Sequence, residues 1–168
     1  MKRLLLAAVA AFVVMPFAAI AQTPVRFSVG GGMSPAVGDL GRTAEVGVSL
    51  AARAEMANNR PWGFRGDLSF DQFGGRSSEP GNQYIGLGAN MVHREKGALY
   101  EFGGLGVYNQ RVHLRVPDSD VDNTNLGMQF GVGYNFKSPR TFVEFGVANV
   151  FTSGANSVWF PVKFGVRF

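Results

Sequence analysis

The sequence predicts an all-β fold: an eight-stranded antiparallel up-and-down transmembrane β-barrel, preceded by a cleaved signal peptide. Three observations lead to this prediction. The N-terminus has a leader pattern, hydrophobic residues alternate with small or polar ones through eight later segments, and the connections between these segments alternate between short and long. The 168 residues include 23 Gly and 15 Phe but no Cys, which excludes a disulfide scaffold and thiolate metal sites. This length suits one domain.

The first 21 residues have the pattern of a signal peptide. A positive start precedes an uncharged apolar run, and Ala19-Ile20-Ala21 supplies the small-x-small site that a signal peptidase cuts. We therefore expect residues 1–21 to be removed and residues 22–168 to form the barrel domain. An uncleaved membrane anchor is the alternative, but Pro16 interrupts the apolar run and no charged stop-transfer residue follows it.

Charge and hydropathy exclude two further classes of protein. Loss of Lys2 and Arg3 with the leader lowers the formal charge from +4 to +2, and no cluster of basic residues remains, so we expect no nucleic-acid partner. A helical membrane protein would need further apolar stretches of about 20 residues. The chain beyond the leader contains none.

From residue 25 onward the hydrophobic residues recur with a period of two, which indicates strands. The clearest case is the C-terminus, where Val or Phe occupies every second position from 158 to 168. At Gly103-Gly104 the alternation slips by one residue, which predicts a β-bulge. In chain order, the eight predicted strands cover residues 25–33, 46–56, 62–73, 82–93, 98–112, 126–136, 141–151 and 158–168.

The connections between the predicted strands are of two kinds. Residues 58–61, 94–97 and 137–140 form short polar turns, whereas the other connections are longer and rich in Gly, Ser, Asp and Asn. A meander with short turns at one end and longer loops at the other explains this difference. About ten residues per tilted strand is also the length that a membrane-spanning strand requires. The longer loops cover residues 34–42, 74–81, 113–123 and 152–157.

Alternation alone leaves open which face points inward. A soluble lipocalin-like barrel would enclose its apolar face around a ligand, whereas a membrane barrel would turn that face toward lipid. Two observations favour lipid: the apolar face carries no ionised residue within the predicted strands, and the opposite face is crowded with glycine. Glycine costs a water-facing strand stability, but the narrow lumen of a small barrel needs small residues between large ones.

The ionised residues on the glycine-rich face nearly balance, which is the third observation in favour of a membrane barrel. Charges enclosed in a small lumen must be paired or remain wet, so equal numbers suit an internal network of ion pairs. Ordinary solvated surface charges that happen to balance are the alternative. The predicted network comprises Arg26, Arg53, Arg65, Lys163, Arg167, Glu55, Asp67, Asp71, Glu101 and Glu144.

With these features the chain resembles the small eight-stranded β-barrels of the bacterial outer membrane, of the OmpA transmembrane domain and OmpX type. The resemblance is architectural and covers residues 25–168. Its most specific element is the C-terminal strand, which ends on an aromatic residue preceded by apolar residues at alternate positions. Pro161 departs from the pattern because it removes a hydrogen-bond donor from the closing strand, and we expect a local bulge near the external end to absorb it. The resemblance implies that this strand is the signal that the barrel-assembly machinery recognises, formed by Phe160, Val162, Phe164, Val166 and Phe168.

The resemblance also implies a cellular location and partners. We expect a protein of the Gram-negative outer membrane with both termini in the periplasm and the four longer loops outside. Its implied partners are outer-membrane lipid and lipopolysaccharide, together with the barrel-assembly machinery during biogenesis. The loops do not identify a specific external ligand.

The candidate catalytic and metal-binding groups fall short of complete sites. Of two histidines, His93 lies beside a tight turn and His113 opens a long loop, and neither has the Ser two positions later that marks the lipid A deacylase family. We therefore predict no catalytic residues and no cofactor. Asp118, Asp120 and Asp122 have the spacing of a calcium loop, but the later EF-hand positions lack Gly and Glu. A solvated acidic turn is the favoured interpretation, with a weak divalent-ion contact as the alternative.

Four arginines lie at or near the outer rim in this topology. Guanidinium groups pair well with phosphate, so contact with lipopolysaccharide is a reasonable hypothesis, and simple solubility of exposed loops is the other. These residues are Arg42, Arg76, Arg111 and Arg115.

Together these features predict a non-enzymatic integral membrane barrel with a structural, envelope-maintenance or surface-interaction role. Eight strands leave an interior just wide enough for side chains, so we expect the lumen to be plugged by side chains and ion pairs. A narrow pore or small-solute transport barrel is the first alternative. A secreted soluble carrier of an apolar ligand is the second.

Overall fold

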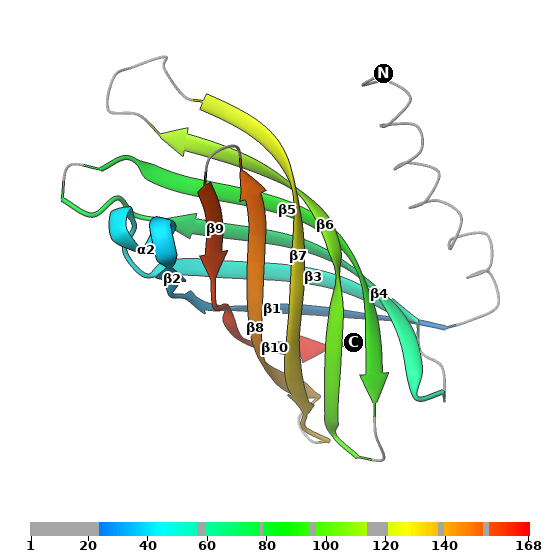
Figure 1. The fold of residues 1–168 in the computed structure, drawn as a ribbon. Helices are drawn as coiled ribbons and strands as arrows, with labels where there is room; N and C mark the ends of the chain where they lie inside the picture. The colour runs from blue at the N-terminus through cyan, green and yellow to red at the C-terminus, as the bar shows by residue number, and fades with distance from the viewer. Residues whose placement is uncertain are drawn as a thin grey trace, which may run out of the picture.

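The computed structural model describes residues 24–56, 60–77, 79–94, 97–113, 121–137, 140–152 and 155–168. These segments form an antiparallel β-sheet that curls into a barrel, with one short helix, α2 (Gly38–Thr43), at one end (Figure 1). None of the helical segments described is long and apolar enough to cross a membrane. The strands are β1 (Val25–Ser34), β2 (Ala36–Val37), β3 (Gly47–Met56), β4 (Trp62–Phe73), β5 (Gly81–Arg94), β6 (Leu99–His113), β7 (Val121–Asn135), β8 (Thr141–Thr152), β9 (Ala155–Trp159) and β10 (Val162–Arg167).

The barrel closes through its last strand. From β3 to β9 each strand pairs antiparallel with the next in sequence, and β10 pairs with both β1 and β8. The ten labelled strands make up eight barrel strands, because two of the eight are interrupted. One is broken at Pro35 between β1 and β2, and the other at Phe160-Pro161 between β9 and β10. The two interruptions face each other, since the Phe160 amide donates to the Pro35 carbonyl at 2.9 Å. The predicted eight-stranded meander is confirmed, and Pro161 lies at the break between β9 and β10 in the strand that closes the barrel.

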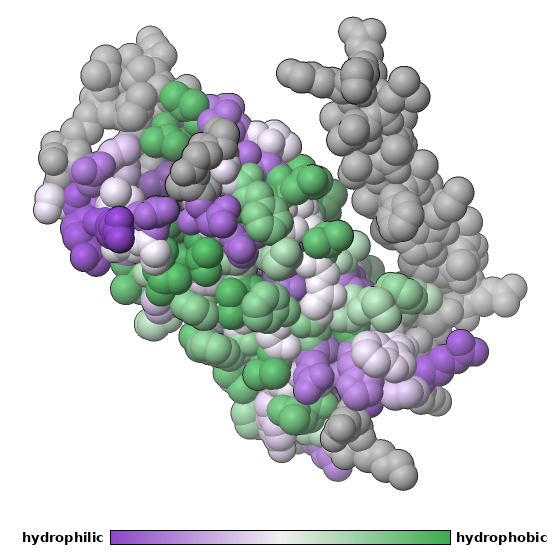
Figure 2. Space-filling view, in the orientation of Figure 1, coloured by the Kyte–Doolittle hydropathy of each residue, from purple (hydrophilic) through white to green (hydrophobic). Residues whose placement is uncertain are grey.

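The apolar face of the strands points outward. Phe164 is 58% exposed and Phe130 50%, whereas Arg53 is 5% and Glu144 3% exposed. Figure 2 shows the outward residues as a hydrophobic band across the middle of the barrel, with hydrophilic residues toward both ends. A belt of this kind is what the hydrocarbon region of a bilayer requires. The predicted orientation, with apolar residues out and charged residues in, is therefore confirmed.

The predicted bulge at Gly103-Gly104 is wrong. Strand β6 pairs with β5 and β7 in an unbroken register through both glycines. Tyr100 and Phe102 are consequently buried in the lumen, and Glu101 between them is exposed on the outer face. Glu101 thus does not belong to the predicted lumen network. The outer face of β6 and β7 carries Glu101, Arg111 and Asp122, so the expectation that this face has no ionised residue is wrong.

The inward glycines make room for the rings of inward aromatic residues. A Cβ on Gly86 would lie 2.6 Å from Cε1 of Tyr108, and one on Gly131 would lie 2.8 Å from Cζ of Phe102. Both separations are too short for real side chains, so each ring occupies the volume that a larger residue would need. Small and large residues thus alternate across the lumen as a barrel of this size requires.

The first long connection contains the short strand β2 and the helix α2. Leu40 on α2 is buried, and α2 and β2 lie beside β9 at the same end of the barrel (Figure 1). We call this the long-loop end. The opposite end, where the turns after β3, β5 and β7 lie, is called the tight-turn end.

Candidate functional site

A set of buried ion pairs lies in the middle of the lumen. Arg65 and Asp67 lie on the inward face of β4, Arg53 on β3 and Glu144 on β8. Arg65 contacts Glu144 Oε1 at 2.7 Å through Nη1 and Asp67 Oδ1 at 2.8 Å through Nε, and Arg53 pairs with the second oxygen of Glu144. Every side chain of this lumen ion cluster is at most 7% exposed.

Neutral groups complete the surroundings of the lumen ion cluster. Tyr100 donates its hydroxyl to Glu144 at 2.6 Å, and Gln129 donates to Asp67 at 3.4 Å. Arg65 also lies 4.2 Å from the ring centroid of Phe102, a cation–π arrangement. Sequence reasoning missed these three neutral partners. The signal for the two aromatic residues was present, because an unbroken alternation through 98–112 places both inward.

Two other predicted network members lie buried on the long-loop side of this cluster. Ser34 donates to Asp71 at 3.1 Å, and Ser49 faces Asp71 across the β3–β4 pairing. Lys163 is 8% exposed and lies opposite Glu144 in the β8–β10 register, but it forms no salt bridge with another described residue.

The remaining predicted members lie at the tight-turn end. Glu55 pairs with Arg94, a residue that the sequence analysis had assigned to a turn. Arg167 donates to the Phe136 carbonyl at 2.6 Å, and Arg26 is exposed at the barrel mouth. Neither Arg26 nor Arg167 forms a salt bridge within the part of the chain that the structure describes. Extending the predicted strand by one residue would have found Arg94, since it continues the inward alternation of β5.

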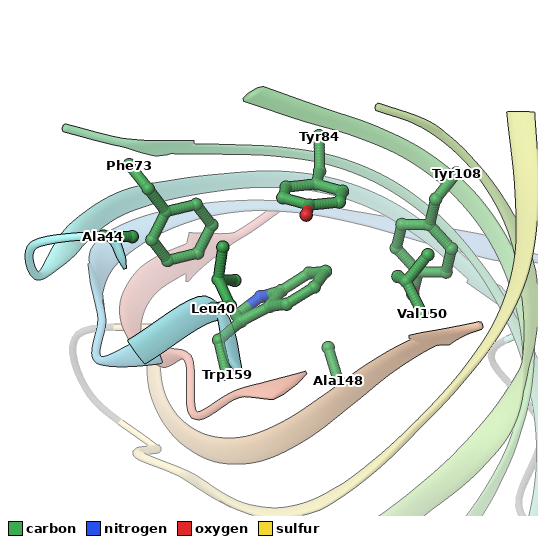
Figure 3. Packing of buried hydrophobic residues seen from close by; sticks show 8 residues of the cluster. All are labelled: Leu40, Ala44, Phe73, Tyr84, Tyr108, Ala148, Val150 and Trp159. Carbon is green, nitrogen blue, oxygen red and sulfur yellow. The ribbon is translucent and has the colours of Figure 1, made fainter. Parts of the chain in front are cut away.

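An aromatic cluster fills the lumen at the long-loop end. Trp159 lies at its centre, with its ring centroid 4.9 Å from that of Tyr84, 5.7 Å from Phe73 and 6.1 Å from Tyr108 (Figure 3). Trp159 and Tyr84 are completely buried, and Tyr84 donates its hydroxyl to Ser157 at 2.9 Å. The charged middle of the lumen is therefore covered on this side by packed rings.

Three of the four rim arginines are described, and they occupy exposed positions at the long-loop end. Arg42 on α2 is 3.6 Å from Asp39, and the amide of Arg76 donates to the Thr43 carbonyl at 2.7 Å, which brings the segments of both arginines together. Arg111 pairs with Asp122 at 2.9 Å. The fourth arginine, Arg115, and the carboxylates Asp118 and Asp120 lie outside the described residues.

The candidate metal and catalytic groups do not assemble into a site in the described ranges. No group of three His, Asp or Glu side chains there could hold a metal ion, and Asp122 is engaged by Arg111. His93 lies beside Trp62 at the tight-turn end, with ring centroids 4.4 Å apart. His113 ends β6, but its side chain lies outside the described part of the structure.

Four of the five C-terminal residues predicted to form the assembly signal are exposed, and the fifth, Phe160, is not. On β10 the side chains at 162, 164 and 166 point outward and are 37%, 58% and 40% exposed, and Phe168 beyond the strand is 68% exposed. Phe160, at the break before β10, is half-buried and stacks on Phe145.

A closed antiparallel ring with an apolar outer belt and a charged lumen defines a membrane-spanning β-barrel. Residues 4–168 match the sequence model of the family described as "Outer membrane protein beta-barrel domain", and the chain belongs to that family. This membership makes it a protein of the bacterial outer membrane. No protein in a search of curated sequences matches the chain.

Solved structures of small outer-membrane barrels have the same fold. The attachment invasion locus protein Ail of Yersinia pestis superposes with a TM-score of 0.60 at 17% identity, over 86% of this chain and 97% of Ail. The N-terminal β-barrel domain of Pseudomonas aeruginosa OprF superposes with a TM-score of 0.62 at 12% identity, over 88% of this chain and 100% of that domain. Neisserial surface protein A superposes with a TM-score of 0.56 at 17% identity, over 85% of this chain and 95% of that protein. At these identities the likeness establishes the fold alone.

Proposed function

We propose that this protein is a non-enzymatic outer-membrane barrel with a structural, envelope-maintenance or surface-interaction role, with a closed lumen and with both termini in the periplasm. The observation that carries the proposal is the filling of the lumen by two successive layers, the lumen ion cluster and the aromatic cluster. Beside the lumen ion cluster, toward Lys163, the free space is a cavity of only about 10 Å³. A void of this size holds about one water molecule.

Single-channel recording in planar bilayers tests the closed lumen against the alternative of a narrow pore. We expect no steady current from the folded protein, because solutes would have to displace buried ion pairs and a fully buried Trp159. A steady current proportional to salt concentration would instead establish a transport barrel. The other alternative, a soluble carrier of an apolar ligand, is ruled out by the outward apolar face and the charged interior.

Lipopolysaccharide contact at the long-loop end is the surface interaction that the residue chemistry favours. Arg42 and Arg76 are exposed on adjoining segments at the end that would face outward, and guanidinium groups bind phosphate through paired hydrogen bonds. The related fold of Ail was also solved with the heparin analogue sucrose octasulfate, so a polyanion binds that protein. A weak divalent-ion contact near Asp122 would add to binding of the same phosphates.

The experiment for this contact replaces all four rim arginines, at 42, 76, 111 and 115, by Gln. We expect lipopolysaccharide binding by the refolded barrel to fall at least about tenfold, since several charge-assisted contacts are lost. The matched control replaces Arg60 and Arg140, which are exposed at the tight-turn end, by Gln. Unchanged binding by the fourfold variant, or an equal loss in the control, would show that the rim arginines serve solubility only.

The assembly signal is part of the same proposal. The outward side chains at 162, 164, 166 and 168 present an alternating apolar edge of the kind that the barrel-assembly machinery is expected to recognise. Deletion of Phe168 should lower the amount of protein in outer membranes while refolding into detergent micelles proceeds normally. Equal loss in both settings would mean that Phe168 is needed for stability only.

A further inference from the structure

The tight-turn end of the lumen contains an open cavity that the lumen ion cluster and the rim arginines do not account for. Its volume is about 220 Å³, and we call it the vestibule. Its floor includes Arg53, Arg65 and Tyr100, and its rim includes the exposed Arg26 and Lys137. Because Arg53 and Arg65 of the lumen ion cluster form its floor, a solute entering the vestibule would meet these ion pairs.

The lining of the vestibule has a large excess of positive charge. Six cationic side chains line it, whereas Glu55 is the single carboxylate among the lining residues. Glu144 and Asp67, which do not line the vestibule, offset part of this charge because they pair with Arg53 and Arg65. Even with those two included, cations exceed carboxylates by three. The six cations are Arg26, Arg53, Arg65, Arg94, Lys137 and Arg167.

Several guanidinium donors around the vestibule have no acceptor. Nε of Arg53, Nη1 of Arg94 and Nε of Arg167 are buried and without a hydrogen-bond partner among the described residues. Arg53, the most buried of these three residues, is 95% buried and lies in the floor of the vestibule. A buried donor without an acceptor costs free energy, and an anion in the vestibule would remove that cost.

We propose that the vestibule binds a small phosphate-bearing anion. Five of the six lining cations are arginines, on β1, β3, β4, β5 and β10, so their donors approach the cavity from different directions. A carboxylate offers two oxygens in one plane, whereas a phosphate offers at least three that point apart and can accept from several guanidinium groups together. The volume is smaller than a drug-sized pocket of about 300 Å³ or more, which restricts the ligand to a compact group such as a diphosphate or the phosphate of a lipid headgroup.

Calorimetric titration of the folded barrel with inorganic pyrophosphate tests the proposal. The protein is held in dodecyl maltoside, which carries no phosphate, in about 0.1 M NaCl so that long-range attraction is screened. We expect saturable binding to one site, and binding of succinate at least about tenfold weaker, because a dicarboxylate cannot satisfy donors that converge from several strands. No saturable heat with pyrophosphate, or equal affinity for succinate, would overturn the proposal.

Substitutions separate the vestibule from general attraction to a basic protein. Arg26→Gln combined with Arg167→Gln should weaken pyrophosphate binding at least about tenfold, since both side chains line the vestibule and neither is part of the lumen ion cluster. Arg60→Gln removes the same kind of charge from the same end outside the vestibule, and it should change the affinity less than about twofold. An equal loss from Arg60→Gln, or none from the double variant, would contradict the assignment.

Two further arms complete the test. If the double variant does not fold, Lys137→Gln at the exposed rim is used instead. We expect this substitution to lower the affinity for pyrophosphate about threefold, and an unchanged affinity would contradict the site. Adding phosphatidylglycerol to the micelles distinguishes the two sources of phosphate. Competition with pyrophosphate identifies a lipid headgroup as the occupant, and independence from the lipid identifies a free phosphate compound. Because the vestibule lies opposite the long-loop end, this test does not depend on lipopolysaccharide binding.

Discussion

Glu144 links residues from three strands in the buried lumen. Its two oxygens accept from Arg53, Arg65 and Tyr100, which come from three different strands. Both guanidinium groups are buried, so the carboxylate is what makes their burial tolerable. Removing one member of such a buried arrangement costs much more than the net stability of the intact arrangement, because it leaves charge uncompensated.

Glu144→Gln should therefore lower the free energy of unfolding by about 3 kcal/mol. The amide keeps the shape of the side chain but removes the charge opposite two arginines, so the loss reports electrostatics rather than packing. Urea-induced unfolding from lipid vesicles measures it. The control is Glu79→Gln, an exposed carboxylate at the long-loop end, which should change stability by less than about 0.5 kcal/mol. A loss below about 1 kcal/mol for Glu144→Gln would mean that water already compensates the arginines.

At the scale of one strand, β6 combines two environments on its outer face. Leu105, near its middle, is 67% exposed, and Glu101, near its tight-turn end, is exposed on the same face. Since the strand crosses the bilayer, the first position belongs to the hydrocarbon and the second to the interface with water. Glu101 also lies beside His93 in the β5–β6 register, and that histidine contacts Trp62. An amphipathic ring near an ionised residue is typical of a membrane interface.

Lysine substitutions along this face should show the difference in depth. Leu105→Lys should destabilise the barrel by about 2–4 kcal/mol, whereas Glu101→Lys should cost less than about 1 kcal/mol. Unfolding from vesicles, compared with unfolding from detergent micelles, measures both effects on one strand and one face. Equal costs at the two positions would mean that the apolar belt does not mark the depth of the bilayer.

At the scale of the whole molecule, closure depends on how tightly β10 fits between β1 and β8. Gly165 lies in that seam, paired with Gly30 on one side and Phe142 on the other. A Cβ at this position would lie 2.5 Å from Cζ of Phe142, so the inward ring already fills the space. Because all backbone groups of a membrane barrel must be paired, a seam that cannot close leaves two open edges in the bilayer.

Gly165→Val should abolish the folded form, seen as loss of the faster-migrating band of unheated protein on denaturing gels. A branched side chain cannot share the seam with the Phe142 ring, whereas Val166→Leu next to it faces lipid and should leave the band unchanged. Recovery of a normal heat-modifiable band for Gly165→Val would show that the seam relaxes around the added volume.

The sequence predicted the eight strands, which face of each strand points inward, and most of the buried charged residues, because each depends on an alternation that is local in the chain. Arg53, Arg65, Asp67 and Glu144 were all placed inward by this rule, and the structure places them in contact. Glu101 was misplaced for the same reason: a one-residue error in alternation exchanges the two faces of a strand. Two adjacent glycines fit either face, so the sequence alone did not reveal that β6 continues without a bulge.

The amino-acid sequence by itself determined the class of fold, because a period of two, the glycine-rich face and the alternation of short and long connections are properties of single strands and their ends. Only the tertiary structure decided which charges meet, and that three neutral side chains, Tyr100, Gln129 and Phe102, surround them. It also decided that cations gather at the tight-turn end while aromatic rings fill the other. Those arrangements depend on the stagger between strands far apart in the sequence, and closure of the ring sets that stagger.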